Sequence, residues 1–182
     1  MSDEFTGGNK RIRHIEFDER KVSKLYETFI CAYYARHYNL GARAKEIDWA
    51  LDEESDSHNL GQLPSMRSDV TLTHGNRKLI IDAKFYKTAM QRYWSHTSVN
   101  SGNFYQIYAY VTNEQHNEPS SKVSGMLLYA KTNEEVLPDM KVTIAGHDLA
   151  ARTLNLACPF KEIAVQLDSI AEAYFGKLEK LP

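Results

Sequence analysis

The sequence contains few cysteines and no long apolar run. Cys31 and Cys158 are the only cysteines among 182 residues, and neither belongs to a paired metal-binding motif. Neither a zinc site nor a disulfide framework is therefore expected, and a reducing cytoplasm is the expected compartment. No apolar stretch reaches the length that crosses a bilayer, and the N-terminus has no apolar signal core. These features give no indication of a membrane protein or an exported one.

The chain also lacks a large net charge. Its 22 basic and 24 acidic residues give a net charge of -2, which argues against a histone-like or strongly basic DNA-binding protein. For nucleic-acid binding, local grouping of basic residues matters more than the total. The centre of the chain contains one such group: Arg77, Lys78, Lys84, Lys87 and Arg92. For Arg77 and Lys78, a solvated strand edge is an equally good interpretation.

Length and composition predict one globular domain. The hydrophobic content of 42% and the charged content of 25% are those of a chain with its own core. Residues 1–13 are polar and contain glycine, so we expect a flexible N-terminal segment there and a single domain over residues 14–182. No internal repeat or low-complexity tract divides the chain further.

Residues 67–86, with the sequence RSDVTLTHGNRKLIIDAKFY, predict two strands joined by a tight turn. A two-residue Gly-Asn turn at positions 75 and 76 would fix the register of this hairpin. The register places Val70 opposite Ile81 on one face and Asp69 opposite Asp82 on the other. Two carboxylates directly across a strand pair repel each other unless a cation lies between them. The alternative interpretation is an ordinary surface hairpin with scattered charges.

The chemistry of this hairpin follows from its two acids and one lysine. Lys84 lies two residues after Asp82 and therefore points to the same side of the strand. Oxygen ligands held in this way suit Mg²⁺, or else Mn²⁺, because Mg²⁺ takes one or two carboxylates and keeps water molecules for a phosphate substrate. A lysine beside such an ion can orient or deprotonate an attacking water. The pattern predicts a metal-dependent phosphodiester hydrolase built on Asp69, Asp82 and Lys84.

A helix is predicted over residues 21–38, and it contributes a possible third acid. Its apolar positions form one broad arc: Val22, Leu25, Tyr26, Phe29, Ile30 and Tyr33. Glu27 lies on the flank of this arc beside Cys31 and Tyr34, where burial of a carboxylate is costly without a cation. We interpret Glu27 as a candidate acid that touches the metal directly or through water. The alternative is a half-exposed glutamate whose stem rests on tyrosines.

The remaining elements complete an α/β pattern. A helix over residues 103–113 carries Gln106 and Tyr110, which lie four residues apart on one side. Short strands are predicted at residues 47–51 and 123–131, a further hairpin at residues 140–156, and a closing helix from Pro159 to Gly176. Residues 88–102 have no clear period and are expected to form a long loop. The expected fold is an α/β sandwich with a mixed central sheet flanked by helices.

The order of these motifs resembles the PD-(D/E)XK nuclease superfamily. Asp69, Asp82 and Lys84 stand at its three signature positions, and Ser68 stands where that pattern usually has proline. The proline is not a ligand, so the chemistry is unaffected. Gln106 and Tyr110 resemble the Q-x-x-x-Y motif that follows the catalytic hairpin in the RecB-like branch. The resemblance implies a restriction-endonuclease-like core.

The wider sequence resembles the nuclease domain of the McrC family, from the 5-methylcytosine restriction system. The resemblance covers about residues 21–175 and rests on LYETF, MRSDV, LIIDAKFY, FYQIYAY and GMLLYA in that order. It implies that Asp69, Asp82 and the carbonyl of Ala83 hold Mg²⁺, with Glu27 supporting the metal or its water. It further implies that Lys84 positions the water, that Gln106 and Tyr110 orient the DNA strand or the lysine, and that cleavage leaves a 5′-phosphate.

The same resemblance implies partners. Double-stranded DNA would be the substrate, and an McrB-like AAA+ GTPase would be the motor, although no segment here is expected to supply the portion of the family that engages it. The sequence contains no P-loop, so GTP hydrolysis by this chain is not expected. Two alternatives remain: a stand-alone repair or phage-type nuclease of the same superfamily, and a non-catalytic DNA- or partner-binding module on the same scaffold.

Overall fold

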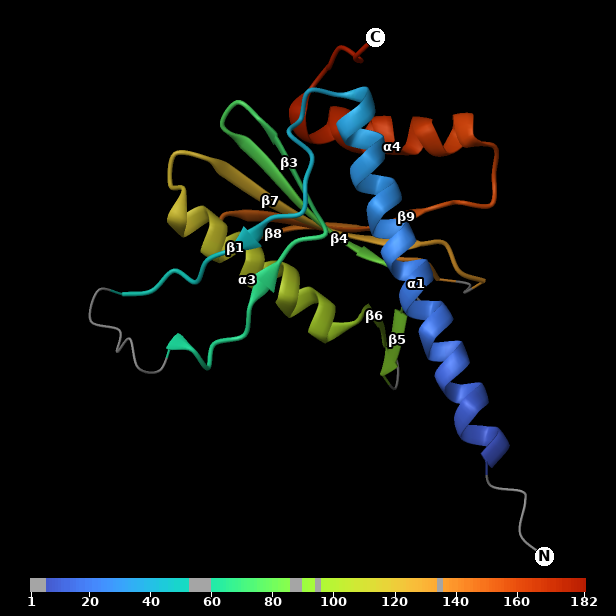
Figure 1. The fold of residues 1–182 in the computed structure, drawn as a ribbon. Coiled ribbons are helices and arrows are strands. Elements are labelled where there is room, and N and C mark those ends of the chain that lie inside the picture. The colour runs from blue at the N-terminus through green and yellow to red at the C-terminus, as the bar shows by residue number, and fades with distance from the viewer. Residues whose placement is uncertain (1–5, 53–59, 86–89, 94–95, 134–135) are drawn as a thin grey trace, which may run out of the picture.

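The structure is a computed structural model, and it describes residues 6–52, 60–85, 90–93, 96–133 and 136–182. Its centre is a five-stranded sheet in the order β3-β4-β7-β9-β8 (Figure 1). The inner pairs β4–β7 and β7–β9 are parallel, and the outer pairs are antiparallel. The strands are β3 (Val70–His74), β4 (Arg77–Lys84), β7 (Lys122–Ala130), β8 (Met140–Ile144) and β9 (His147–Leu154). The prediction of a mixed sheet is therefore confirmed.

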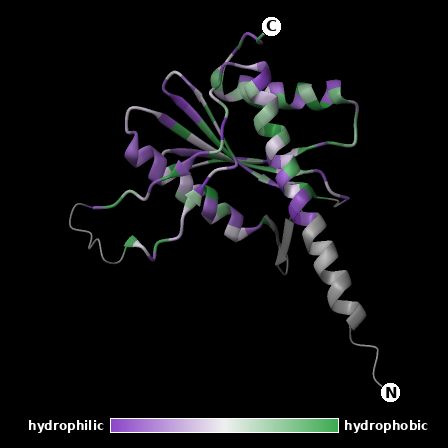
Figure 2. Cartoon of the chain, viewed as in Figure 1, coloured by the Kyte–Doolittle hydropathy of each residue, from purple (hydrophilic) through white to green (hydrophobic). Residues whose placement is uncertain are grey.

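Helices cover both faces of this sheet. The helices α1 (Thr6–His37) and α4 (Phe160–Phe175) pack on one face, where Ile30 and Leu167 join a core that includes Ile81. The helix α3 (Ser101–Asn117) packs on the other face, where Ile107 joins a core that includes Ile80. Figure 2 shows hydrophobic and hydrophilic residues alternating along α4, as expected for a helix with one buried side. The fold is thus an α/β sandwich with a restriction-endonuclease-like core.

The β3–β4 hairpin has the predicted register. Val70 pairs with Ile81 and Leu72 pairs with Leu79, and all four side chains are fully buried. Gly75 occupies the first turn position with a φ of 58°, a conformation that glycine adopts without the strain it causes other residues. The local turn therefore sets which residues of the two strands face each other.

The buried side of α1 differs from the predicted one. Val22 and Leu25 are 38% and 68% exposed, although both were expected in the core. The buried side is centred instead on Ile30 and Tyr34, and Tyr34 Oη donates a hydrogen bond to the Leu167 carbonyl of α4 (2.9 Å). The buried arc is therefore rotated around the helix, away from Val22 and Leu25, which line an open apolar cavity instead. The helix also begins at Thr6, within the segment that was expected to be flexible.

Two further stretches differ from the prediction. The strand expected at residues 47–51 is limited to β1 (Glu46–Ile47), which pairs with β2 (Met66–Arg67). The loop expected at residues 88–102 contains an antiparallel pair, β5 (Met90–Tyr93) and β6 (His96–Val99). The helix α3 begins soon after, at Ser101, because the Asn100 side chain accepts a hydrogen bond from the Asn103 N–H and caps the helix.

Close packing and an ion cluster hold α3 against the sheet. At Gly125 on β7, an added Cβ would lie 2.7 Å from Val111 Cγ2 and 2.8 Å from Ile107 Cγ1, so glycine permits the close approach of α3. At the C-terminal end of α3, Glu114 is 2% exposed and accepts hydrogen bonds from Lys45 (2.5 Å) and Lys78 (2.6 Å). These contacts fix α3 relative to β4. In the described part of the chain, no helix is both long and apolar enough to cross a membrane.

Candidate active site

The hairpin brings Asp69 and Asp82 into one cavity. Asp69 directly precedes β3, and its Oδ2 accepts a hydrogen bond from the backbone N–H of Ala83 on β4 (2.8 Å). That bond holds the Asp69 carboxylate beside the strand segment that carries Asp82. Both aspartates and Ala83 line a cavity of about 190 Å³ at the C-terminal end of β4. The predicted juxtaposition of the two carboxylates is therefore present.

Asp82 is a buried carboxylate whose nearest cation is Lys84. Asp82 is 2% exposed, and the Lys84 Nζ lies 2.6 Å from its Oδ2. This Oδ2 is buried, and the Lys84 ammonium is its ion-pair partner among the described residues, although their geometry is not that of a regular hydrogen bond. One ammonium balances only one of the two aspartates of the cavity, so the pair still suits a further cation.

A hydrogen-bonded chain ties Lys84 to α3. Lys84 Nζ donates to Gln106 Oε1 (3.1 Å), and Gln106 Nε2 donates to Tyr110 Oη (2.7 Å). The amide of Gln106 therefore has its orientation fixed at both ends. Of the two α3 residues selected by their spacing and by resemblance, Gln106 contacts the lysine of the hairpin directly and Tyr110 acts on it through Gln106.

Glu27 reaches the same cavity from α1. It lines the cavity together with Ser23, and its side chain is 20% exposed. Its Oε2 accepts a hydrogen bond from Lys24 Nζ (2.8 Å) on the preceding turn of the helix. Within the described residues, no three His, Cys, Asp or Glu side chains lie close enough together to hold one metal ion. Glu27 is therefore near the two aspartates but does not form a single ligand set with them.

The positive charge in the cavity does not fully balance the negative charge of its carboxylates. Burial, followed by the charge of Asp82, raises the pKa of Asp69 to about 7. Burial also raises the pKa of Asp82, while the ammonium of Lys84 opposes this effect. The negative charge of Glu27 adds to the rise for both aspartates. A divalent cation would relieve these unfavourable interactions.

The residues present fit a magnesium ion. Two carboxylates and one backbone carbonyl are hard oxygen ligands, and Mg²⁺ commonly takes one or two carboxylates and completes its shell with water. Asp69, Asp82 and the Ala83 carbonyl offer such a set at the cavity wall. The strongest indication that a cation belongs there is the pair of carboxylates in one cavity, where burial and the charge of Asp82 raise the pKa of Asp69.

Sequence reasoning missed one basic residue of the cavity. Arg67 on β2 lines it, and the residue is exposed at the surface. Arg67 lies two residues before Asp69, and in an extended segment that spacing places two side chains on the same side. The signal was therefore present in the sequence. The predicted basic group, in contrast, is divided, because Arg77 and Lys84 occupy opposite ends of β4, and Lys87 lies outside the described residues.

Together the fold and the cavity define an α/β protein with a restriction-endonuclease-like core and an acidic site on its central hairpin. The sequence model of the McrBC 5-methylcytosine restriction system component family matches residues 20–130, which is more than half of the chain. The chain therefore belongs to that family, and the resemblance seen in the sequence is confirmed. All six predicted side chains of the site lie within the matched residues.

One curated relative extends this comparison. The chain is 27% identical over 168 residues to the type IV methyl-directed restriction enzyme EcoKMcrBC of Escherichia coli strain K12. That match covers 92% of this chain and 47% of the relative. The chain thus spans about half the length of the curated relative it matches.

Proposed function

We propose that this chain is a Mg²⁺-dependent DNA endonuclease and the nuclease component of a modification-dependent restriction system. The observation that carries the proposal is the pair of aspartates in one cavity, with Lys84 beside the buried Asp82. Membership of the McrBC family supports the restriction role. Double-stranded DNA would be the substrate, and an McrB-like AAA+ GTPase would be the motor partner.

Asp69, Asp82 and the carbonyl of Ala83 would hold the ion. Bound there, Mg²⁺ would neutralise charge on the scissile phosphate and lower the pKa of a coordinated water. The hydrogen bond from the Ala83 N–H keeps Asp69 in place for this task. Glu27 would act on the same site through water, because it does not share one ligand set with both aspartates.

Lys84 would orient the attacking water and offset charge that develops on the phosphate. Its ammonium is held between Asp82 and Gln106, so its position is set before the substrate binds. Gln106 and Tyr110 are positioning residues in this scheme, because they act through the lysine. Arg67, which is exposed and lines the cavity, would contact a DNA phosphate.

The decisive experiment compares the wild type with Asp82→Asn in two assays. Plasmid DNA with and without 5-methylcytosine is incubated with Mg²⁺ or with EDTA, in the absence and presence of an McrB-like GTPase. In parallel, the thermal shift caused by Mg²⁺ is measured without DNA. We expect Asp82→Asn to abolish cleavage and the Mg²⁺-dependent thermal shift while leaving the circular dichroism spectrum unchanged.

The matched control is Asp139→Asn, because the Asp139 side chain is 80% exposed and far from the hairpin in sequence. This variant should keep both cleavage and the thermal shift. Full cleavage by Asp82→Asn would refute the assignment. Cleavage of unmethylated DNA without the GTPase would instead favour a stand-alone nuclease of the same fold.

A further inference from the structure

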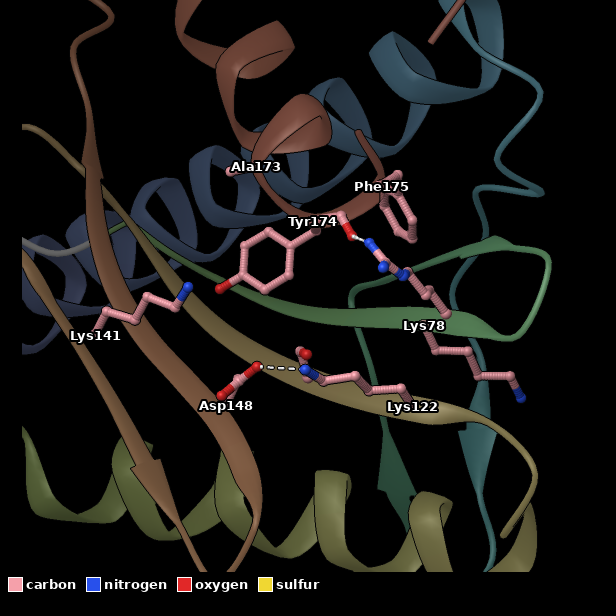
Figure 3. A pocket seen from close by; sticks show the side chains of 9 residues that line it. Lys78, Lys122, Lys141, Asp148, Ala173, Tyr174 and Phe175 are labelled. Carbon is pink, nitrogen blue, oxygen red and sulfur yellow. Dashed lines mark hydrogen bonds and ion pairs between the residues drawn. The ribbon is translucent and has the colours of Figure 1, made fainter. Parts of the chain in front are cut away.

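A second cavity lies at the opposite end of β4 from Lys84. Its volume is about 160 Å³, and it opens where β4 and β7 begin, below the last turn of α4 (Figure 3). Arg77 and Lys84 are the first and last residues of β4, so this cavity lies roughly 20 Å from the candidate active site. Among the residues that line it are six polar ones on the α4 side of the sheet: Arg77, Lys122, Ser124, Lys141, Asp148 and Tyr174.

The strand registers place these polar residues in a row on one face. Arg77 pairs with Lys122 across β4 and β7, and Lys141 pairs with Ala150 across β8 and β9. Ala150 belongs to the core on the α1 and α4 side, and Asp148 lies two residues before it on the same side of β9. Farther along the same face, the side chains of β4 and β7 belong to the hydrophobic core, whereas β9 carries the charged Arg152. The row is therefore a polar end of a largely hydrophobic face, and Tyr174 of α4 lies against it.

The cavity has more positive than negative charge. Among the described residues, Asp148 is the single acidic one that lines it, and Asp148 Oδ2 lies 3.0 Å from Lys122 Nζ in an ion pair. The charge of Lys141 also acts on Asp148, so this one carboxylate faces three cations (Arg77, Lys122 and Lys141), and two positive charges remain in excess. Arg77 uses one nitrogen, Nη1, to donate to the Tyr174 carbonyl (3.1 Å), which anchors the guanidinium at the rim. Lys78 also lines the cavity, but its ammonium pairs with Glu114 on the α3 side.

Tyr174 adds a hydroxyl group that the rest of the fold does not use. Its Oη is buried and has no hydrogen-bond partner among the described residues. Figure 3 shows this hydroxyl pointing across the cavity towards Lys141. Native structures rarely leave a buried hydroxyl unpaired, because the loss of its bonds to water is costly. A bound acceptor oxygen would remove that cost.

We propose that this cavity binds a phosphate group, with Arg77, Lys141 and Tyr174 Oη donating to its oxygens. Two unmatched cations and one hydroxyl suit an anion with several acceptor oxygens and up to two negative charges. The phosphate can come from a small molecule, such as inorganic phosphate or the terminal phosphate of a nucleotide, or from the backbone of DNA. The site is independent of the proposed nuclease centre, and part of its wall lies beyond the family match at residues 20–130.

Calorimetric titration of the full chain with inorganic phosphate, in EDTA and at low ionic strength, tests the small-molecule source. We expect binding by the wild type and about tenfold weaker binding by Tyr174→Phe and by Lys141→Gln, because each loses one donor to a charged acceptor. Tyr174→Phe removes only a hydroxyl without a protein partner, so it should fold normally. Lys177→Gln is the matched control, because Lys177 is exposed nearby and does not line the cavity.

Metal-free duplex DNA tests the other source. If a backbone phosphate occupies the cavity, Lys141→Gln should make the slope of log DNA affinity against log salt concentration shallower by about one. Lys177→Gln should leave this slope unchanged. Phosphate binding with an unchanged slope would identify a small-molecule ligand. The proposal is overturned if the wild type binds no phosphate and both lysine variants behave alike on DNA. Because no assay here uses a metal or measures cleavage, the result does not depend on whether the chain is a nuclease.

Discussion

Replacing Asp69 with asparagine is expected to stabilise the metal-free chain, although it removes a proposed metal ligand. Burial and the charge of Asp82 raise the pKa of Asp69 from 3.8 to about 7. Between these values the folded chain holds a proton on Asp69 that the unfolded chain has released. The free energy of unfolding therefore falls as the pH rises through this window. A shift of about three units corresponds to about 4 kcal/mol of unfolding free energy.

The asparagine side chain never ionises, and it keeps an oxygen that can accept the hydrogen bond from the Ala83 N–H. Its amide NH₂ must find an acceptor in the cavity, which offsets part of the gain. We therefore expect Asp69→Asn to unfold with a free energy about 2–4 kcal/mol above that of the wild type at about pH 8. At about pH 4 the difference should nearly vanish, because both side chains are then close to neutral in the folded state.

The assay is urea unfolding in EDTA, followed by circular dichroism at both pH values. Mg²⁺ is then added at the higher pH, where it should stabilise the wild type and leave Asp69→Asn unchanged. Asp139→Asn serves as the control and should show no pH-dependent difference, because Asp139 is exposed. Lower stability of Asp69→Asn at both pH values, or an equal difference at both, would refute the reasoning.

Three further predictions concern the lysine, the ion cluster and the packing of α3. Lys84→Ala should keep the Mg²⁺-dependent thermal shift but lose cleavage by about 100-fold or more, measured on plasmid DNA. Glu114→Ala should lower the free energy of unfolding by up to about 3 kcal/mol, because it removes the buried carboxylate that Lys45 and Lys78 share and leaves them only the more exposed Glu118. Gly125→Ala should lower it by about 1–3 kcal/mol in urea, because the added methyl group overlaps two α3 side chains.

Each of these variants has a matched control. For Lys84→Ala the control is Lys161→Ala, which removes an exposed lysine of α4. For Glu114→Ala the control is Glu179→Ala, which removes an exposed acid near the C-terminus. For Gly125→Ala the control is Gly61→Ala, which adds a methyl group where no heavy atom lies within 4 Å. Equal loss of metal binding and cleavage in Lys84→Ala would contradict its separate role. Control-like stability of Glu114→Ala or Gly125→Ala would contradict the packing described for α3.

The hairpin could be predicted because its information is local. The Gly75 turn and the alternation of Val70 and Leu72 fix the register without reference to the rest of the chain. The register in turn places Asp82 and Lys84 on one side of β4. The central part of the candidate site therefore followed from a stretch of about twenty residues, a length at which turn chemistry and alternation dominate.

The buried side of α1 could not be predicted in the same way. Val22 and Leu25 continue the apolar pattern of the helix, yet both are exposed at an open cavity, whereas Tyr34 is fully buried and bonds to α4. Which part of a wide apolar arc is buried depends on where distant elements pack, and periodicity does not contain that information. The β5–β6 pair was missed for a related reason, because its strands have four residues each and no clear alternation.

From the topology of the sheet, we expect the parts of the candidate site to form at different stages of folding. Asp69 and Asp82 belong to one hairpin, and hairpins close within about 1–10 μs. The parallel neighbour of β4 is β7, which follows only after the intervening residues 85–121, so this pairing must close a long loop. Gln106 lies in that intervening segment. We therefore expect the acidic pair to come together before the lysine acquires its neighbour on α3.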